Sequence, residues 1–393
     1  MTMNLMFAAS GLAPEVHDRV LSAVRRVGSR YPQMDAAGPR SWVIGDAFLV
    51  SFASDQAIRD GRRPAHEAPD AITVMDGVLL DPSGAMHPYD AREGAADWDT
   101  LASTAEGRFA FFRVNRPSGQ LEVLVDPLGI RHVFEASSNG AWMVSTSAGV
   151  IELVLGSREP DPTGVSMLLA TDWVWGTRTI RRGISVVPGG TRTSATAGTI
   201  RRTQHFSPRT VALLDQDAFD AERAAALASD MTTMLRTLAN AEKHPINCPI
   251  SGGKDTRVLA ALCLHGEVPT RFWTQGDART RDVTVAQAFV ARYRVTHRFA
   301  NRPNSSVESS TTTTDVLDDW EANIRRLVLR TDGMASMSLI GNVAGIPPVI
   351  SYLETTLSGL GGEIARHSPS DPIIFHAGSS VARVRAALVR HYL

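Results

Sequence analysis

The sequence predicts an α/β protein in two parts, an antiparallel β-sandwich followed by a region built on a parallel sheet. Short apolar segments separated by turn residues dominate the chain up to about residue 206. Strands and helices then alternate, which is typical of a parallel sheet. The character of the sequence changes near residues 204–215. We therefore predict a first domain at residues 1–206, a linker at 207–215 and a second domain at 216–393.

The first part contains many predicted strands and few helices. The hairpin connection at residues 115–119 contains Pro117 and Gly119, residues that favour turns. Helices are predicted at residues 14–26 and 145–155. Strands are predicted at residues 41–44, 48–52, 71–75, 109–114 and 121–125. This pattern favours stacked antiparallel sheets.

The second part begins with a long alanine-rich helix at residues 216–241, whose apolar positions follow helical spacing. Residues 305–314 are rich in Ser and Thr and predict a loop, and residues 315–330 predict an amphipathic helix. Between these segments we expect, in order, a strand at 246–250, a helix at 257–265 ending at Gly266, a strand at 270–274, a helix at 282–293 and a strand at 295–299. This alternation predicts parallel strands.

Composition limits the function. The 393 residues are 43% hydrophobic and 21% charged, as in ordinary globular proteins. A net charge of -1 gives no electrostatic case for nucleic acid or an anionic membrane. We find no apolar run of membrane-spanning length and no signal peptide. The only cysteines, Cys248 and Cys263, match neither a metal nor a disulfide pattern. We expect a cytoplasmic protein without a nucleic-acid or membrane partner.

Residues 251–256, Ser-Gly-Gly-Lys-Asp-Thr, lie between a predicted strand and a predicted helix. Glycines let the backbone approach phosphate oxygens, and a helix N-terminus stabilises anions. Asp255 would repel phosphate but could hold a Mg²⁺ ion that binds it. This is not a Walker A loop, because Asp255 follows Lys254 and Cys248 stands where that motif has its first Gly. A glycine-rich turn with a helix-capping Asp255 is the alternative interpretation.

The loop resembles the S-G-G-x-D-S pyrophosphate loop of the N-type ATP pyrophosphatases, with Thr256 in the last Ser position. Those enzymes split ATP into AMP and pyrophosphate and leave the AMP on a carboxyl group.

Both halves of the chain resemble the asparagine synthetase family. The resemblance implies a glutaminase-like sandwich of the Ntn-hydrolase type followed by an ATP pyrophosphatase domain, which is adenine nucleotide α-hydrolase-like. The segments that carry it are 107–111 (G-R-F-A-F), 126–131 (D-P-L-G-I-R), 145–147 (S-T-S), 183–189 (G-I-S-V-V-P-G), 282–286 (D-V-T-V-A) and 357–363 (L-S-G-L-G-G-E).

The chain departs from the family at the amidase site. Family glutaminases use a Cys directly after the initiator Met as nucleophile, whereas this chain has Thr2. Thr2 could act as an N-terminal nucleophile. However, Asp76 replaces the family's oxyanion-binding Asn, and its carboxylate would repel the developing charge. We therefore expect a first domain that is a scaffold without amidase activity.

The resemblance implies ATP and Mg²⁺ as cofactors, with Asp255 and Glu363 as catalytic residues and Mg²⁺ ligands. Glu363 could instead be a solvated residue at a helix start, and Lys254 an exposed lysine. We expect His297 and His367 to be structural, and Trp173 and Trp175 to pack. The predicted ATP-binding residues are Ser251, Gly252, Gly253, Lys254, Thr256, Ser358, Gly359 and Gly361.

The implied activity is an AMP-forming amide-bond ligase. A carboxylate attacks the α-phosphorus of ATP, and an amine then displaces AMP from the acyl-adenylate. Family members without the Cys include β-lactam synthetases and lasso peptide cyclases, which join an internal amine to the activated carboxylate. We therefore predict macrolactam formation on a small-molecule or peptide carboxylate substrate. A leader-peptide recognition protein or a protease is the expected partner.

Two alternatives remain. One is asparagine synthetase-type transfer of ammonia to aspartate. The other starts from the C-terminus: family members continue further and use a later Lys, whereas this chain ends 30 residues after Glu363 and has no Lys beyond Lys254. Either an arginine or a partner supplies that charge, or the sequence is truncated, or the protein is a weak or catalytically inactive, nucleotide-binding partner protein.

Overall fold

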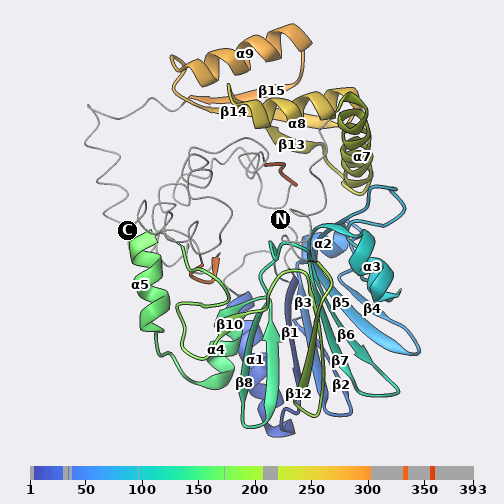
Figure 1. The fold of residues 1–393 in the computed structure, drawn as a ribbon, viewed down its shortest axis with the longest axis vertical. Coiled ribbons are helices and arrows are strands. Elements are labelled where there is room, and N and C mark those ends of the chain that lie inside the picture. The colour runs from blue at the N-terminus through green and yellow to red at the C-terminus, as the bar shows by residue number, and fades with distance from the viewer. Residues whose placement is uncertain are drawn as a thin grey trace.

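The computed structural model describes residues 4–29, 34, 38–95, 97–171, 173–206, 220–301, 331–334 and 355–358. Residues 4–206 form a sandwich of antiparallel sheets, and residues 220–301 form a region with a parallel sheet (Figure 1). We call these the sandwich and the parallel-sheet region. The predicted change from antiparallel to parallel structure is confirmed.

The strands of the sandwich pair in two antiparallel sheets. In the described part of the chain, the first sheet has the order β10-β8-β9-β1-β3-β2 and the second β12-β11-β7-β6-β5-β4. The strands are β1 (Asn4–Ser10), β2 (Arg40–Ile44), β3 (Ala47–Ala53), β4 (Ala65–Glu67), β5 (Ala71–Leu80), β6 (Glu106–Asn115), β7 (Leu121–Val125), β8 (Phe134–Ser138), β9 (Ala141–Ser145), β10 (Ser185–Val186), β11 (Thr191–Thr196) and β12 (Thr199–Gln204). The five predicted strands of this part are confirmed as β2, β3, β5, β6 and β7.

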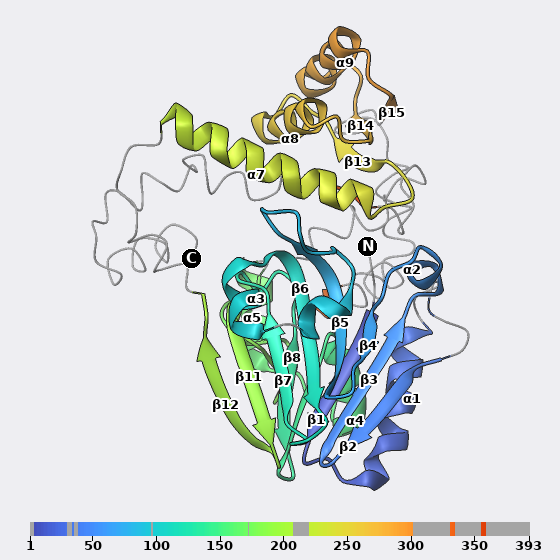
Figure 2. The same cartoon turned by 90° about the vertical axis from the view of Figure 1, so that its right-hand side faces the viewer.

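Alternating side chains of each strand serve different cores, because successive residues point to opposite faces of a sheet. In β6, Ala110 and Phe112 pack between the two sheets. Phe109 and Phe111 lie in a separate core on the outer face, together with Trp98 of α3. The outer face of the first sheet has its own core under α1 and α4. The sandwich is therefore layered helix, sheet, sheet, helix (Figure 2).

Helices α1 (His17–Gly28) and α4 (Ala148–Leu155) cover the outer face of the first sheet, and α3 (Trp98–Thr104) lies on that of the second. This part of the chain also contains α2 (Asp55–Arg59), α5 (Pro162–Thr171) and the short 3-10 turns η1 (Pro14–Val16) and η2 (Ala91–Ala95). The helix predicted from residue 145 begins only at Ala148, because Ser145 still pairs with Phe7 of β1.

Residues 331–334 lie against this sandwich although they come late in the sequence. The Asp332 Oδ1 atom accepts hydrogen bonds from Ser147 Oγ (2.8 Å) and Gly149 N (3.1 Å) at the N-terminus of α4. Met334 is 8% exposed and belongs to the core under α1 and α4. The later half of the chain thus provides a carboxylate that caps a helix of the earlier half.

The parallel-sheet region contains β13 (Ile246–Pro249), β14 (Thr270–Gly276) and β15 (His297–Asn301), which pair in parallel. Helices α7 (Ala221–Asn240), α8 (Lys254–His265) and α9 (Arg281–Tyr293) surround them. The helix expected from residue 257 begins three residues earlier, at Lys254, and ends before Gly266 as predicted. The strand expected from residue 295 begins at His297.

A further segment pairs with the other edge of β13. The Leu357 N–H donates to Asn247 O (2.8 Å), and the Asn247 N–H donates to Thr355 O (2.9 Å). The bridge between Asn247 and Thr356 is parallel. Residues 355–357 therefore extend the parallel sheet on the side of β13 that is opposite β14.

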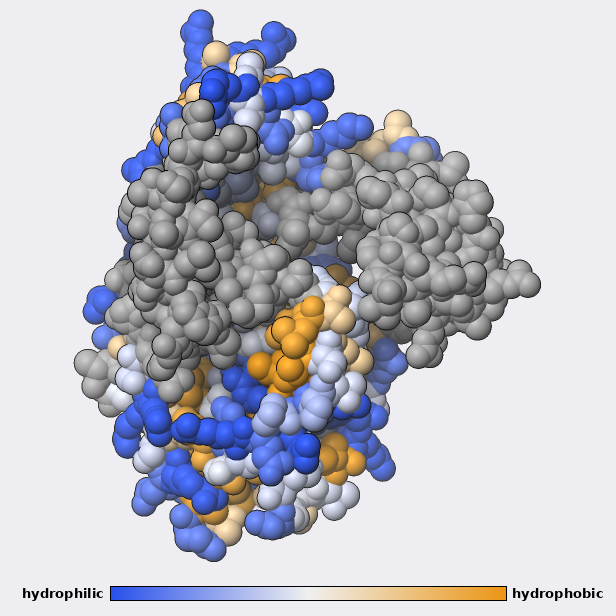
Figure 3. All heavy atoms as spheres, turned by 90° about the vertical axis from the view of Figure 1, so that its left-hand side faces the viewer, coloured by the Kyte–Doolittle hydropathy of each residue, from blue (hydrophilic) through white to orange (hydrophobic). Residues whose placement is uncertain are grey.

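One expectation about packing is wrong. Trp173 and Trp175 are 52% and 63% exposed, and Leu169 of α5 is 75% exposed. Figure 3 shows an apolar patch on the face that is turned to the left in Figure 1, the side on which α5 lies. Among the described residues, no helix is both long enough and apolar enough to cross a membrane.

Candidate functional site

The glycine loop lies at a point where the strand order reverses. From β13 the chain passes through α8 to β14 on one side, whereas residues 355–357 reach the other side of β13 from much later in the sequence. In open parallel sheets, ligands bind beyond the carboxyl ends of the strands at such a switch point. Residues 251–256 follow β13 at this edge.

The structure brings Ser358 to the same edge. Asn247 lies opposite Thr356 in a parallel register, and two residues further along each strand stand Pro249 and Ser358. Continuing that register places Ser358 beside the last residue of β13, just before the loop. Two predicted site segments that are about a hundred residues apart in sequence thus meet. Gly359, Gly361 and Glu363 lie outside the described residues.

Hydrogen bonds to β14 fix the start of the loop. The Ile250 N–H donates to Trp273 O (2.9 Å), and Ile250 O accepts from Thr274 Oγ1 (2.8 Å). Ile250 is 2% exposed. The backbone therefore leaves the sheet at a defined position at Ser251.

The loop is closed by its own hydroxyl groups. The Ser251 N–H donates to Thr256 Oγ1 (3.2 Å), and the Gly253 N–H donates to Ser251 Oγ (3.0 Å). The two hydroxyl oxygens lie 3.0 Å apart. The predicted phosphate donors therefore converge in one compact turn. To bind a phosphate they would exchange these internal bonds for bonds to its oxygens.

Gly252 is required by the approach of α9. A Cβ atom at residue 252 would lie 2.5 Å from Asp282 Oδ1 and 3.0 Å from Asp282 Cα, so a larger residue would have to displace Asp282. Val283 and Ala286 hold α9 in place, being 1% and 0% exposed. The D-V-T-V-A segment of the resemblance therefore contributes a carboxylate beside the loop. Sequence reasoning identified this segment but gave Asp282 no role in the site.

The N-terminus of α8 is suited to an anion. Its N-cap residue is Gly253, and no side chain caps it in the part of the chain that the structure describes. The first turn of a helix carries partial positive charge, which favours phosphate. Lys254 is exposed, and Asp255 is partly buried in the first turn. The first turn of α8 could therefore accept an anion, and Lys254 is exposed beside it.

For Mg²⁺ the described residues supply one predicted ligand, the Asp255 carboxylate. They include no group of three or more His, Cys, Asp or Glu side chains that could hold a metal ion. A Mg²⁺ ion at this site would share its coordination between Asp255 and phosphate oxygens, as is common for this ion in nucleotide sites.

An ion pair that sequence reasoning missed lies after β14. Asp277 is 6% exposed and pairs with Arg279 through two bonds, Nη2 to Oδ2 (2.7 Å) and Nε to Oδ1 (3.0 Å). The bond from Asp277 raises the pKa of Arg279. The Ala278 N–H donates to Asn301 Oδ1 (3.2 Å) at the end of β15. Asp277 and Asn301 come directly after strands that the sequence predicts to be parallel. This position was the feature of the sequence that could have identified them as site residues.

Neither the cysteines nor His297 are candidates for catalysis. Cys248 and Cys263 are buried, and the hydrogen bond that the Cys248 thiol donates to Cys263, together with burial, raises the pKa of Cys248. A buried thiol of this kind is a poor nucleophile. His297 Nε2 lies 2.9 Å from Thr274 Oγ1, and burial lowers the pKa of His297. His297 is therefore structural, as predicted, whereas His367 lies outside the described residues.

At the sandwich, the position of the family's oxyanion-binding Asn is blocked. Asp76 is 3% exposed, and its Oδ1 atom accepts the Asn4 N–H (2.8 Å). Its Oδ2 atom pairs with Arg131. Both carboxylate oxygens are thus occupied, and neither can donate to an oxyanion. Thr2 lies outside the described residues.

The D-P-L-G-I-R turn holds Arg131 in this position. Asp126 accepts the N–H groups of Ile130 (3.0 Å) and Arg131 (2.8 Å). Burial raises the pKa of Asp126 against the opposing effect of these bonds. The turn therefore orients Arg131, which is the partner of Asp76 in the blocked site.

Little space remains beside Asp76. The cavity there has a volume of about 20 Å³ and is lined by Asn4, Asp76 and Gly77, with Arg62 and Tyr89 on its wall. This volume is sufficient for about one water molecule.

No protein-family model matches the sequence, and no curated protein matches it. Among solved structures, the chain is similar to a glutamine phosphoribosylpyrophosphate amidotransferase from B. subtilis complexed with ADP and GMP. The identity is 9%, the TM-score is 0.31, and the match covers 79% of this chain and 70% of that one. It is also similar to a structure described as the allosteric regulatory enzyme of purine biosynthesis, with 9% identity, a TM-score of 0.31, and coverage of 91% and 95%. Likeness at this level carries no argument about chemistry, and the resemblance to asparagine synthetases stays a prediction.

Proposed function

We propose that the chain is an AMP-forming ligase that activates a carboxylate with ATP and joins it to an amine. The observation that supports this proposal is the meeting of the Ser251–Thr256 turn and the Ser358 segment at the switch point of a parallel sheet. Loops at such a point bind phosphate groups in many α/β proteins.

In this proposal the residues of the turn bind and orient the nucleotide. The hydroxyls of Ser251 and Thr256 and the N–H groups of the turn hold the pyrophosphate oxygens. Gly252 lets the backbone approach them. Asp255 holds Mg²⁺, which would offset charge on the leaving pyrophosphate. Ser358 contacts the nucleotide from the neighbouring strand, and holding the carboxylate and the amine in one site supplies orientation.

The blocked site in the sandwich bears on the source of nitrogen. In this proposal that site does not hydrolyse glutamine, because Asp76 is paired to Arg131 and about 20 Å³ of space lies beside it. The amine must then already be present. This favours an internal amine on the substrate, and hence macrolactam formation, over transfer of ammonia to aspartate. A peptide substrate would bring with it a leader-recognition protein or protease partner.

The test is pyrophosphate release from Mg·ATP by the purified chain, with a panel of carboxylates that includes aspartate, and without glutamine. We expect Asp255→Ala to lower the rate at least about 100-fold, since a catalytic metal contributes several kcal/mol. Asp99→Ala is the matched control, because Asp99 also lies in the first turn of a helix but belongs to the sandwich.

Three outcomes are informative. Release that depends on Asp255 supports the ligase, and the carboxylate that provokes it identifies the substrate class. Binding of Mg·ATP without release supports a catalytically inactive nucleotide-binding partner protein instead. A chain that neither binds nor cleaves ATP contradicts the proposal.

A further inference from the structure

Glu242 lies at the centre of a buried polar network between the sandwich and the parallel-sheet region. Arg62 Nη2 donates to both of its carboxylate oxygens, at 3.0 Å and 2.8 Å. The Arg62 and Glu242 side chains are only 5% and 8% exposed. The hydroxyls of Tyr89 and Thr355 also donate to Glu242 Oε1. Glu242 thus connects two residues of the sandwich to a residue of the late strand.

The sandwich side of this network is rigidly packed. The Arg62 guanidinium lies 3.9 Å from the centre of the Tyr89 ring, close enough for a cation–π interaction. Burial raises the pKa of Tyr89, so its hydroxyl keeps the proton that it donates. Arg62 and Tyr89 also belong to the wall of the small cavity beside Asp76. Two residues at the edge of the blocked site therefore also hold Glu242.

The other side of the network ends at the candidate nucleotide site. The Thr355 hydroxyl contacts both Glu242 and the Tyr89 hydroxyl, the latter at 3.0 Å. The carbonyl of Thr355 accepts the Asn247 N–H, and Leu357 completes the pairing with β13. The next residue is Ser358. Any shift of Thr355 would therefore move Ser358 relative to the glycine loop.

A buried charge pair of this kind holds geometry strongly. Removing one partner leaves the other charge buried without compensation, and the surrounding bonds reinforce one another in a low dielectric. In Figure 2, the C-terminal end of α7, after which Glu242 follows, lies directly above the end of the sandwich.

We propose that Glu242 is a positioning residue for the nucleotide site: held by Arg62 and Tyr89, it fixes Thr355 and so keeps Ser358 beside the glycine loop. The effect of this positioning on nucleotide binding rests on the proposed function. It gives the sandwich a defined task, namely to position one strand of the parallel sheet.

The first experiment replaces the Thr355 hydroxyl. Thr355→Val removes it at nearly constant shape, and Thr355→Ser keeps it. We expect amide hydrogen exchange of Leu357 and Asn247 to become about tenfold faster in Thr355→Val and to return toward the wild-type rate in Thr355→Ser. A purely steric role for residue 355 predicts no rescue by Ser, and equal exchange in both variants would overturn the proposal.

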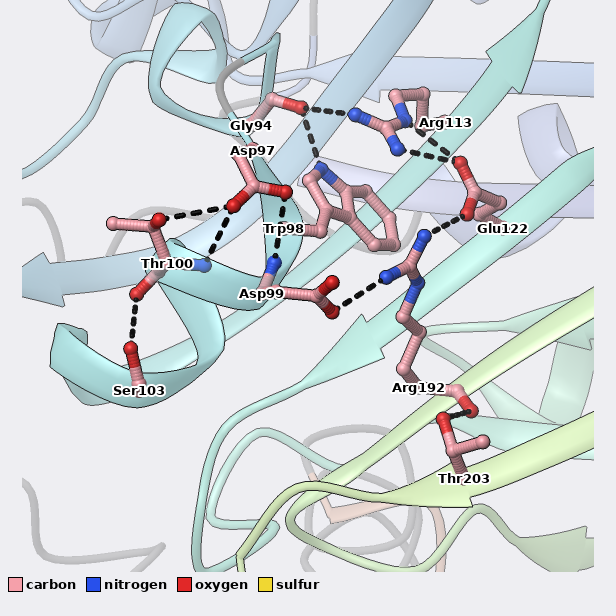
Figure 4. A network of polar contacts seen from close by, with 10 residues as sticks. All are labelled: Gly94, Asp97, Trp98, Asp99, Thr100, Ser103, Arg113, Glu122, Arg192 and Thr203. Atoms are coloured by element: carbon pink, nitrogen blue, oxygen red, sulfur yellow. Dashed lines mark hydrogen bonds and ion pairs between the residues drawn. The ribbon is translucent and has the colours of Figure 1, made fainter.

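The second experiment compares two buried glutamates. Glu242→Gln should speed the same exchange and weaken Mg·ATP binding about tenfold, because the charge pair is lost. Glu122→Gln is the matched control. Glu122 is 6% exposed and pairs with Arg113 (2.6 Å) and Arg192 (2.7 Å) within the sandwich, as Figure 4 shows. Glu122→Gln should lower the free energy of unfolding. It should leave hydrogen exchange at Leu357 and the Kd for Mg·ATP unchanged.

The two readouts separate the possible failures. If the wild-type chain does not bind Mg·ATP, the proposed function fails, whereas hydrogen exchange still decides whether Glu242 positions the strand. If both glutamate variants change exchange at Leu357 equally, the effect is general destabilisation and the positioning role is contradicted. If ATP binding weakens in Glu242→Gln without faster exchange, the proposed route through Thr355 is wrong.

Discussion

The blocked site of the sandwich and the glycine loop of the parallel sheet differ in what occupies their polar groups. At Asp76, the Asn4 backbone N–H and the charged Arg131 hold the two carboxylate oxygens, and little space remains. At the glycine loop, the hydroxyls of Ser251 and Thr256 are bonded mainly to one another and to nearby N–H groups. Neutral bonds of that kind can be exchanged for bonds to a ligand at modest cost, whereas a buried ion pair cannot. The comparison teaches that resemblance to a two-site enzyme does not imply two working sites.

The largest expected effect is that of a substitution at Gly252 in the glycine loop. Gly252→Ala would place a methyl group against Asp282, so the Asp282 carboxylate must turn away and the loop or α9 must shift slightly. A displacement of about 1 Å at an active site can cost about 100-fold in rate, and we expect at least that loss of pyrophosphate release.

The control for this substitution is the neighbouring glycine. A Cβ atom at residue 253 would lie 3.2 Å from Ser251 Oγ, and the backbone of Gly253 is in an extended conformation that other residues adopt. Gly253→Ala should therefore reduce the rate much less. Equal losses in the two variants would argue against the packing of α9 on the loop.

A second prediction concerns the blocked site. Asp76→Asn keeps an acceptor for the Asn4 N–H but removes the charge that pairs with Arg131. We expect the free energy of unfolding to fall by about 2 kcal/mol, less than for a fully buried pair because Arg131 retains some solvent contact. Urea unfolding measures the change. We also expect no glutamine hydrolysis, and its appearance would show that Asp76 alone blocks the site.

A third prediction uses the positions of the cysteines. Both lie in the parallel-sheet region, so thiol labelling reports the opening of that region alone. We expect slow labelling in the native state, and a further slowing of about tenfold when Mg·ATP is present at about ten times its Kd. Labelling that does not respond to the nucleotide would place ATP binding, if any, elsewhere.

The smallest expected effect concerns Asp332. Burial raises its pKa, although Arg181 and the bonds from Ser147 and Gly149 oppose the shift. A carboxyl group with a raised pKa in the folded state stabilises the fold at low pH, and this contribution is lost as the pH rises through that value. Both hydrogen bonds end on Oδ1, an atom that Asn also has. Asp332→Asn should therefore be close to neutral at pH 7 and should reduce the pH dependence of stability.

For Asp332, urea unfolding at pH 5 and pH 8 is the measurement. Asp332→Ala, which removes the acceptor, should lose about 1–3 kcal/mol. An equal loss in Asp332→Asn would show that the charge itself stabilises α4, contrary to this account.

Local pattern predicted much of the fold. Short apolar segments bounded by turn residues identified β3, β6 and β7, whose central residues are buried on both faces, and helical spacing identified α7. The start of α4 was predicted too early, since Ser145 is held in β9 by pairing with β1, a partner that is distant in sequence. The exposure of Trp173 and Trp175 was missed because an aromatic residue type favours burial but does not ensure it.

At the site, the sequence predicted the segments that meet but not what surrounds them. The glycine loop and Ser358 were found from short motifs. Asp282 beside Gly252 and the Glu242 network depend on side chains that are brought together only by tertiary packing. Asp282 stands in the D-V-T-V-A segment, but that motif does not indicate its contact with Gly252, and Glu242 lies in no motif.

The central claim is that the glycine loop activates a carboxylate while the sandwich supplies no ammonia. The most direct test incubates the purified chain with Mg·ATP, a carboxylate panel and glutamine, and measures pyrophosphate and glutamate in the same reaction. The account predicts that pyrophosphate forms and glutamate does not. Formation of glutamate, or the absence of pyrophosphate with every carboxylate and amine offered, would contradict it.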